Sequence, residues 1–337
     1  MTSPSVTISI VTWNSGVFIL PCIKALEIQT RKDIAIRIVD NASRDETLTL
    51  LSEEYPHFKI MRLSNNLGFS RAQNFTIALA QTPYILVLNP DVLLSPNFLE
   101  QAITMLEKNP ELGSVQGKLL RFSWESGDDL REPIRSDILD TTGLRGTLAR
   151  NFVNRGEGEK DEGQYDSLQD IFGPSGACAL YRREALESVK HGREYFDEDF
   201  FAYADDSDLA WRLQRAGWKS VFFPDALAWH YRNVKGGTSL RESISARHGR
   251  PLYLRKLAAA NAPAVLVKNL DARTFWKNSP RIIGREAAKM LYRLFREPKV
   301  IAGYSRFLRL LPRYLQKRRM IQRHQKVDPA SLNHYFS

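Results

Sequence analysis

The feature that most constrains the fold is an alternation of β-branched apolar runs with helical segments in the N-terminal third of the chain. Three such runs are strongly marked and a fourth is weaker: Val6–Trp13, Ile34–Ser43, Tyr84–Asp91 and Phe58–Leu63. Strands that are separated by helices favour a mostly parallel sheet with right-handed crossovers. We therefore expect an α/β fold with a mostly parallel central sheet flanked by helices.

Local sequence signals also predict two helix starts and one loop. Ser43 followed by Glu46 has the spacing of a capping box, and Ser95 precedes a proline, Pro96, that suits a first helical turn. The stretch Asn154–Asp166 has almost no apolar residues and is expected to be a mobile loop.

Small and polar residues follow the strongly marked strands. These residues are Thr12, Asn14, Ser15, Asp40, Asn41, Ser43, Asn89 and Asp91. Ligands of open α/β sheets bind beyond the carboxyl ends of the strands. The pattern alone therefore predicts a nucleotide site at this edge of the sheet.

Length and composition fit a folded protein. With 337 residues, 43% of them hydrophobic and 26% charged, the chain can form one large α/β domain with an appendage or two modest domains. Its two cysteines, Cys22 and Cys178, lack CxxC spacing, which favours a reducing compartment over a disulfide framework. The N-terminal segment has no signal-peptide pattern, and no apolar run is long enough for a transmembrane helix. We therefore expect a cytoplasmic protein.

The net charge of +10 is concentrated near the C-terminus. Residues 271–326 contain 16 Lys and Arg against 3 Asp and Glu, which indicates an anionic partner for this region, either a membrane surface or nucleic acid. Five basic residues with helical spacing predict a basic stripe on one face of a helix: Arg281, Arg285, Lys289, Arg293 and Arg296. A second basic segment contains Pro312, which is expected to break or kink it.

Basic amphipathic helices of this kind suit an anionic lipid surface. No nucleic-acid-binding module is visible in the sequence, so we expect no nucleic-acid partner. The alternative is that the helices pack on the main domain and that their basic residues form only a solvated face.

Aspartates in two separate segments are candidates for chemistry. Asp91 follows an apolar strand and could coordinate a hard divalent cation, although Asn-Pro-Asp is also common turn chemistry. Asp205, Asp206 and Asp208 start a predicted helix that ends at Gly217. They could cap this helix or pair along its surface, or one of them could act as a general base.

Two further segments have weaker signals. His230 is either structural or a metal ligand, the latter if it lies near Asp91. The segment Asn65–Arg71 places a turn and one arginine ahead of a helix, which suits a phosphate but also fits an ordinary loop.

Taken together, these segments resemble the bacterial family 2 glycosyltransferases, which are inverting enzymes of the GT-A fold. The likeness is greatest to rhamnosyltransferase-like members and runs from about residue 5 to about residue 235. The stretches that carry it are SIVTWNSG, IVDNASRDET, NNLGFSRAQN, LNPDVLL, GPSGACALYRREAL and FFAYADDSDLAWRLQRAGW, followed by His230. Each motif is weak alone, but their order and spacing are specific.

The resemblance implies roles for residues around the donor. Thr12 and Asn14 would line the nucleotide, Asp40 would hydrogen-bond the base, and Arg71 would lie near the donor. Each role rests on the match of this chain to the family's motifs.

The resemblance also implies a metal site. Asp91 takes the place of the last aspartate of the family's DxD motif, whereas Asn89 stands at its first position. His230 would be a further ligand. The expected cofactor is a divalent metal, magnesium or manganese.

On the acceptor side, the resemblance assigns the base. Gly176, Ala177 and Asp205 would border the acceptor. Asp206 corresponds to the second acid of the family's "ED" motif and would be the general base.

The resemblance finally implies an organisation and an activity. Residues 1–240 would form the catalytic domain, with a nucleotide-binding half at 1–120 and an acceptor half at 121–240, and residues 241–337 would form a basic helical appendage. The expected reaction transfers a sugar from dTDP-rhamnose, or from a UDP-sugar, to a lipid-linked or polysaccharide acceptor in surface-glycan synthesis, on the inner face of the membrane. A sugar nucleotidyltransferase and a non-catalytic membrane- or polyanion-binding protein stay open as alternative functions. Assembly into a homo-oligomer also stays open.

Overall fold

The computed structural model of the chain describes residues 3–124, 133–167, 169–232 and 249–337. The strands are β1 Val6–Thr12, β2 Ile34–Asp40, β3 Ile60–Arg62, β4 Tyr84–Leu88, β5 Val92–Leu94, β6 Leu112–Ser123, β7 Ile134–Thr141, β8 Leu144–Gly146, β9 Phe152–Asn154, β10 Asp170–Ile171, β11 Cys178–Arg182 and β12 Lys219–Tyr231. The helices are α1 Gly16–Glu27, α2 Thr47–Glu54, α3 Phe69–Ala78, α4 Phe98–Lys108, α5 Arg183–Val189, η1 Glu198–Phe200, α6 Asp205–Arg215, α8 Leu252–Asn269, α9 Ala272–Arg296, α10 Pro298–Arg323 and η2 Pro329–Tyr335.

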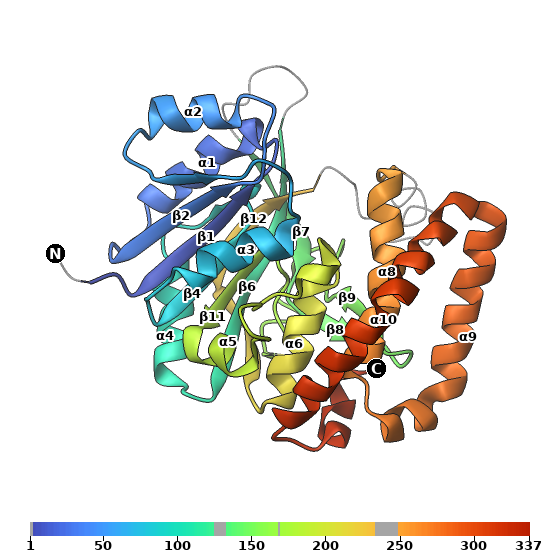
Figure 1. Cartoon of the computed structure of the whole chain (residues 1–337). Helices are drawn as coiled ribbons and strands as arrows, with labels where there is room; N and C mark the ends of the chain where they lie inside the picture. Colours follow the sequence, from blue (N-terminus) through green and yellow to red (C-terminus); the bar gives the residue numbers. More distant parts are fainter. Residues whose placement is uncertain (1–2, 125–132, 168, 233–248) are drawn as a thin grey trace.

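A large central sheet with the strand order β10-β12-β6-β11-β4-β1-β2-β3 forms the body of the molecule (Figure 1). The four N-terminal strands β3, β2, β1 and β4 are parallel, as the alternating pattern predicts. Beyond them β11 runs antiparallel to both β4 and β6, whereas β6 and β12 are parallel to each other. The α/β prediction is confirmed, with the two halves of the sheet joined through β11.

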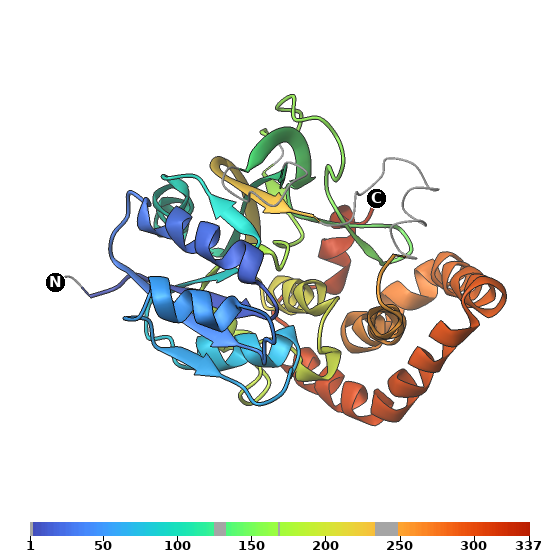
Figure 2. The ribbon, with the colours of Figure 1, turned by 90° about the horizontal axis from the view of Figure 1, so that it is seen from above.

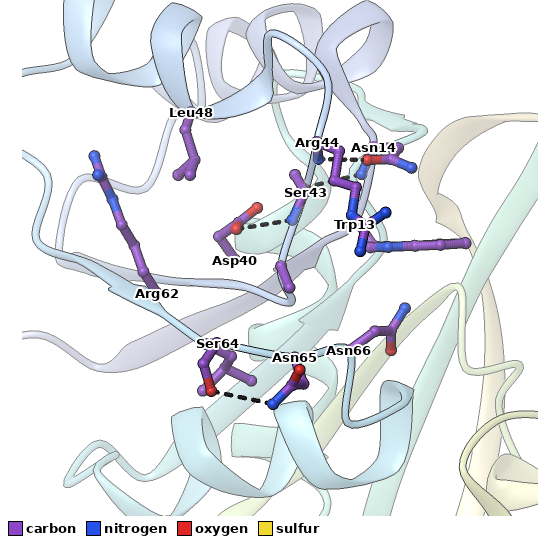
Figure 3. A pocket seen from close by; sticks show the side chains of 12 residues that line it. Trp13, Asn14, Asp40, Ser43, Arg44, Leu48, Arg62, Ser64, Asn65 and Asn66 are labelled. Atoms are coloured by element: carbon purple, nitrogen blue, oxygen red, sulfur yellow. Dashed lines mark hydrogen bonds between the residues drawn. The ribbon is translucent and has the colours of Figure 1, made fainter.

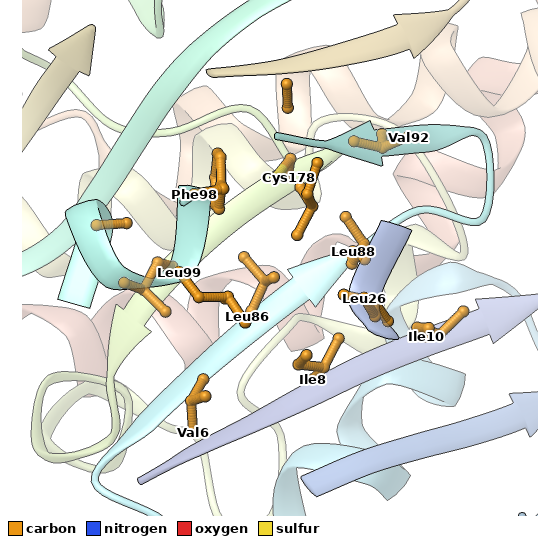
Figure 4. Packing of buried hydrophobic residues seen from close by; sticks show 14 of the residues in the cluster. Val6, Ile8, Ile10, Leu26, Leu86, Leu88, Val92, Phe98, Leu99 and Cys178 are labelled. Atoms are coloured by element: carbon orange, nitrogen blue, oxygen red, sulfur yellow. The ribbon is translucent and has the colours of Figure 1, made fainter. Parts of the chain in front are cut away.

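The two faces of the sheet bury different residues of the same strands. On β4, Leu86 and Leu88 belong to the cluster beneath α1 and α4, together with Ile8 of β1 (Figure 4). The intervening Ile85 and Val87 pack instead against α3, α5 and α6. This alternation follows from the two-residue period of a strand, and both faces are covered by helices.

Most predicted element boundaries are close to the observed ones, but the two predicted helix starts are wrong. Helix α2 begins at Thr47, after Ser43, because the Ser43 backbone N–H donates to the carboxylate of Asp40 (3.1 Å) and does not enter a helix. The capping-box assignment for Ser43 therefore fails. Helix α4 likewise begins at Phe98, beyond the predicted first turn at Pro96.

The polar stretch at Asn154–Asp166 is anchored, in contrast to the mobile loop that its composition predicts. Lys118 of β6 forms ion pairs with Asp161 (3.0 Å) and Asp166 (2.8 Å). The backbone N–H of Leu139 also donates to the carbonyl oxygen of Glu159 (2.8 Å). Charged side chains thus hold the segment where apolar ones are missing.

Of the three long C-terminal helices, α8 packs beside α6 and α10 packs along α8, whereas α9 lies at the outer edge of the molecule (Figure 1 and Figure 2). Val265 of α8 and Tyr314 of α10 share one hydrophobic cluster with Phe200 and Trp211 and with Phe336 near the C-terminus. No helix in the described residues is long and apolar enough to cross a membrane. Helix α10 continues through Pro312, so the predicted break at this proline is wrong.

The predicted basic stripe exists on α9, but its middle residues face the protein. Arg293 is buried, and Arg285 and Lys289 are only partly exposed. Apolar side chains occupy the outer face of the helix; those exposed are Trp276, Ile283, Met290, Leu291, Leu294 and Phe295. The spacing predicts the stripe correctly; Arg281 and Arg296 at its ends are exposed, whereas its middle residues are turned toward the protein.

Candidate active site

A pocket of about 620 Å³ lies at the carboxyl ends of β1, β2 and β3 (Figure 3). Residues between positions 13 and 66 line it, among them Trp13, Asn14, Asp40, Arg44 and Asn66. The indole of Trp13 is 46% exposed, which is high for so large an apolar side chain. An exposed aromatic ring beside buried polar groups suits a nucleotide base.

Asp40 lies at the back of this pocket and is almost completely buried. Parallel pairing sets Thr12 directly opposite Asp40, and the Thr12 hydroxyl donates to the Asp40 carboxylate (3.0 Å). Asp40 lines the pocket, and its hydrogen bond to a nucleotide base stays a prediction. Thr12 is fully buried behind it and orients Asp40, so it does not itself line the pocket.

Asn14 joins the two loops that form the pocket rim. Its backbone has a φ of 51°, in the left-handed region that asparagine tolerates better than most residues. Its side-chain oxygen accepts a hydrogen bond from the backbone N–H of Arg44 (2.8 Å), and its own N–H donates to the hydroxyl of Ser43 (3.0 Å). Asn14 therefore lines the pocket and fixes its shape.

Arg71 lies outside the set of residues that line this pocket. Its side chain, on α3, is half exposed and pairs with Glu198 of η1 (3.4 Å). The structure thus connects Arg71 with the segment that precedes α6.

Asp91, His230 and Asp140 form a chain of contacts at the next strand end. The Nε2 atom of His230 lies 3.3 Å from Asp91 Oδ1, and its Nδ1 atom lies 2.7 Å from Asp140 Oδ2. Burial alone would lower the pKa of His230, but the two carboxylates raise it to about 9. The pairing of β12 with β5 brings His230 opposite Val92, the residue after Asp91.

Asp91 and His230 are the candidate ligands that the sequence assigned to a divalent cation, and the structure brings them together. Asp91 Oδ1 is buried, and its neighbour His230 Nε2, at 3.3 Å, does not form a hydrogen bond of good geometry with it. A carboxylate on the far nitrogen of a histidine is the usual support for a metal-ligating imidazole. The described residues contain no group of three His, Cys, Asp or Glu that could hold a metal ion. Diphosphate and water oxygens would therefore have to complete the coordination, as is common for Mg²⁺.

The segment Gly176–Ala177 connects this strand end with Asp206. The carbonyl oxygen of Ala177 accepts a hydrogen bond from the backbone N–H of Asn89 (2.8 Å). The backbone N–H of Gly176 donates to the carboxylate of Asp206 (3.3 Å). Asn89 takes part through its backbone, which positions Asp91 two residues later.

Asp205 and Asp206 begin α6 side by side. Burial and the charge of Asp206 raise the pKa of Asp205 to about 8, and burial raises the pKa of Asp206. The ionised form of each carboxyl group is therefore disfavoured. Asp206 Oδ1 also accepts hydrogen bonds from the backbone N–H (2.6 Å) and the hydroxyl (3.1 Å) of Ser207. A carboxylate that is held in place and has a raised pKa suits general-base catalysis.

Asp208 has a structural environment, as the helix-surface pairing in the sequence suggests. Its carboxylate binds Arg212 (3.0 Å), four residues later, and Lys268 of α8 (2.7 Å). Lys268 is completely buried and also pairs with Asp197. These contacts tie α6 to the C-terminal helices.

The turn before α6 has an unusual backbone that is held from outside. Phe201, Tyr203 and Ala204 have φ values of 65°, 71° and 66°, which non-glycine residues rarely adopt. The side-chain amide of Asn261, on α8, donates to the carbonyl oxygens of Phe200 (2.9 Å), Ala202 (2.9 Å) and Tyr203 (3.0 Å). Such backbone strain persists where the surroundings determine it, and it clusters at functional sites.

Sequence reasoning missed Asp140 and Asn261. Asp140 lies 90 positions from His230, and its strand β7 contains a second aspartate, Asp137, so no local spacing singles it out. Asn261 sits in an alanine-rich helical stretch where its polarity was the only local signal.

Comparison with known proteins identifies the family of this chain. A family model described as Glycosyl transferase family 2 matches residues 7–190. The N-acetylglucosaminyl-diphospho-decaprenol L-rhamnosyltransferase of Mycobacterium tuberculosis is 27% identical over 251 residues, which cover 71% of this chain and 80% of the relative.

Two solved structures share the fold. The mannosyltransferase PcManGT from Pyrobaculum calidifontis, in complex with GDP-Man and Mn²⁺, has a TM-score of 0.50 at 17% identity, covering 99% of this chain and 88% of that one. GalNAc-T7 with UDP, GalNAc and Mn²⁺ has a TM-score of 0.54 at 12% identity, covering 88% of this chain and 58% of that one. Because the family match spans more than half of the chain, this protein belongs to the family 2 glycosyltransferases and has the GT-A fold.

Proposed function

We propose that the protein is an inverting, divalent-metal-dependent glycosyltransferase that transfers a sugar from a nucleotide-sugar donor to a lipid-linked acceptor in surface-glycan synthesis. The observation that carries the proposal is the position of the Gly176–Ala177 segment between two groups. Asp91 and His230 lie near its Ala177 end, and Asp206 accepts a hydrogen bond from its Gly176 end. One end suits a metal-bound diphosphate and the other a general base. The similarity to the mycobacterial enzyme makes dTDP-rhamnose the first donor to test, ahead of UDP-sugars.

The residues divide the work of a single displacement. Trp13, Asn14 and Asp40 bind the nucleoside, and Asp91 with His230 would hold magnesium or manganese, which offsets charge on the leaving diphosphate. Asp206 removes the proton of the acceptor hydroxyl as that oxygen attacks the anomeric carbon. Attack from the face opposite the leaving group inverts the configuration. Gly176, Ala177 and Asp205 border the acceptor.

A donor panel tests the proposal. The purified chain is incubated with dTDP-rhamnose, UDP-sugars and GDP-sugars, with and without Mg²⁺ or Mn²⁺, and lipid extract as acceptor. Mass analysis of a glycosylated lipid, with release of a nucleoside diphosphate, supports the proposal. Release of pyrophosphate would identify a nucleotidyltransferase instead, and no turnover of any donor would indicate a non-catalytic binding protein.

Asp140→Asn tests the support of the metal site. The variant keeps an acceptor atom for His230 Nδ1 but loses the charge that holds the ring, so we expect the metal affinity to fall about 10- to 100-fold. Activity titrated against Mn²⁺ measures the shift. Asp137→Asn, on the same strand and exposed, is the matched control. Equal metal requirements for Asp140→Asn and wild type would contradict a metal role for His230.

We also propose that the protein works as a peripheral protein on the cytoplasmic face of a membrane, with the outer face of α9 against the lipid. This face combines exposed apolar residues with exposed cations such as Lys277, Arg281 and Arg296. The acidic residues of the region are turned inward: Asp271 caps α9, Glu286 binds Lys289, and Glu297 binds Arg255. An isologous dimer through this face would bring like charges together, whereas anionic lipid would neutralise them.

Leu291→Ser together with Phe295→Ser tests this surface. Each buried apolar side chain contributes about 1.5–3 kcal/mol, so we expect the double variant to lose at least roughly tenfold in affinity for anionic vesicles. Vesicle co-sedimentation measures the loss. Leu79→Ser, an exposed leucine at the end of α3, is the control. A double variant that binds vesicles like the control, or a wild type that dimerises without binding them, would contradict the lipid contact.

A further inference from the structure

A second cavity, of about 170 Å³, lies where the C-terminal helices meet the start of α6. Its walls come from four parts of the chain, namely the β8–β9 hairpin, the first turn of α6, and helices α8 and α9. It shares no lining residue with the nucleotide pocket. A volume of this size holds about five water molecules, which is enough for a phosphate group.

Three cationic side chains line this cavity against a single acid. Arg150 comes from the hairpin, and Arg285 and Lys289 come from the inward face of α9. The acid is Glu286, which binds Lys289 (2.6 Å) and lies 3.6 Å from Arg285. Burial lowers the pKa of Lys289 to about 8 against the attraction of Glu286, and the three cations that line the cavity outnumber this one acid. An anion in the cavity would relieve this excess of positive charge.

Arg150 adds a buried guanidinium to the cavity wall. Its side chain is 6% exposed, and its Nε atom has no hydrogen-bond partner among the described residues. One of its terminal nitrogens donates to Asn333 (2.6 Å), and the guanidinium stacks over Phe336. Buried guanidinium nitrogens are normally paired, and phosphate oxygens match their geometry.

The other lining residues are mostly apolar, among them Phe152, Val265 and Leu266, with Asn151 and Ser207 as the polar exceptions. A cationic side facing an apolar side suits an amphiphile in which a phosphate adjoins a hydrocarbon chain. The cavity also reaches the candidate base, because Ser207 lines it and donates two hydrogen bonds to Asp206. A ligand here would lie within one residue of the group that activates the acceptor.

We propose that this cavity is the subsite for the phosphate or diphosphate that links the acceptor sugar to its lipid, with Arg150, Arg285 and Lys289 as its cationic contacts. This inference rests on the proposed function, since it assigns the class of acceptor to the same active site. The proposed subsite explains why the middle of the basic stripe on α9 faces the protein. Arg285 and Lys289 would bind the phosphate or diphosphate of the acceptor, while the outer face of α9 contacts the lipid.

Direct binding in metal-free buffer tests the subsite without requiring catalysis. Farnesyl diphosphate is titrated into the full chain, saturated with UDP, by isothermal calorimetry, and inorganic pyrophosphate serves as the second probe. Lys289→Gln and Arg285→Gln should each weaken farnesyl diphosphate binding about 10- to 100-fold, the worth of a charge-assisted hydrogen bond. Arg281→Gln, on the same helix but exposed, should bind like wild type. Thermal melting of each variant checks that it is folded.

Steady-state kinetics form the second test. They show whether the cavity binds the diphosphate of the acceptor or that of the donor. For N-acetylglucosaminyl diphospho-farnesol, KM should rise about 10- to 100-fold in Lys289→Gln and Arg285→Gln. KM for the donor, and KM for a farnesyl N-acetylglucosaminide that lacks phosphate, should not change. A rise in donor KM would show that the cations serve the donor's diphosphate and would overturn the proposal.

Two outcomes distinguish failure of the subsite from failure of the function. If farnesyl diphosphate binds equally well to wild type and to both cavity variants, or does not bind to the UDP-saturated wild type, the subsite is wrong even where sugar transfer is observed. If the calorimetric pattern holds but no donor is turned over, the subsite stands as an anion site and the proposed transferase reaction fails.

Discussion

Asp206→Asn lowers kcat by about 10²- to 10⁴-fold while donor binding stays near that of wild type. The asparagine has the size of the aspartate, and its oxygen can still accept the hydrogen bonds from Ser207, whereas its amide nitrogen cannot accept the bond from Gly176. It cannot take up the proton of the acceptor hydroxyl. Because the donor pocket is formed by residues 13–66, the affinity for the nucleotide sugar should be independent of this change. Initial rates at saturating donor and acceptor, with calorimetry for the donor, measure both quantities.

The control is Asp225→Asn, which removes an exposed carboxylate from β12. Near-normal turnover by a folded Asp206→Asn protein would show that another group is the base. Asp205→Asn would then be the next variant, since its carboxylate is adjacent and buried.

The pH dependence of the rate gives an independent readout of the same pair. The pKa of Asp205 is raised to about 8 by burial and by its neighbour, and burial raises that of Asp206. The base acts in its ionised form, so kcat/KM should increase with pH as the pair loses its last proton, up to about pH 8. A profile that is already flat above about pH 5, as for an ordinary aspartate, would contradict a buried and coupled base.

Lys268→Met lowers the free energy of unfolding by about 3 kcal/mol. The ammonium group is completely buried and pairs with Asp197 and Asp208 (2.7 Å). Removing one partner of a buried pair leaves uncompensated charge, at a loss of about 3–5 kcal/mol. The lower end applies here because Lys317 still pairs with Asp197 and Arg212 still pairs with Asp208.

Urea denaturation measures this loss, and Lys277→Met, the same substitution on an exposed lysine of α9, is the control. A loss below about 1 kcal/mol, which is typical of a surface ion pair, would show that the buried network does not depend on Lys268.

The strands and the donor edge of the sheet were predictable from the sequence because they depend on local pattern. Alternating apolar residues specify β1, and the polar residues after β1, β2 and β4 follow from how parallel strands end. The sequence named His230 as a metal ligand only if it lies near Asp91. It could not show that the two residues are close, because their contact depends on the pairing of β5 with β12. Asp140 was beyond reach for the same reason, with no motif to indicate it.

The orientation of α9 shows a different limit. Helical periodicity states which residues share a face, but it does not state which face packs against the protein. The burial of Arg293 depends on Tyr304, whose hydroxyl accepts a hydrogen bond from its guanidinium, and the position of Lys289 depends on the cavity beside it. These contacts come from the tertiary arrangement. Similarly, the Ser43–Glu46 spacing fits a helix cap, but the backbone N–H of Ser43 donates a hydrogen bond to the carboxylate of Asp40 instead.

The bonds from Asn261 to the turn before α6 have a consequence for building chimeric enzymes. The pocket proposed for the nucleoside is made from one continuous stretch near the N-terminus, so exchanging that stretch between relatives should carry base preference with it. The turn that presents Asp205 and Asp206 is shaped by a side chain more than fifty residues downstream. A graft that aims to change acceptor preference must therefore include α8, because the acidic segment transplanted alone would lose the amide that imposes its conformation.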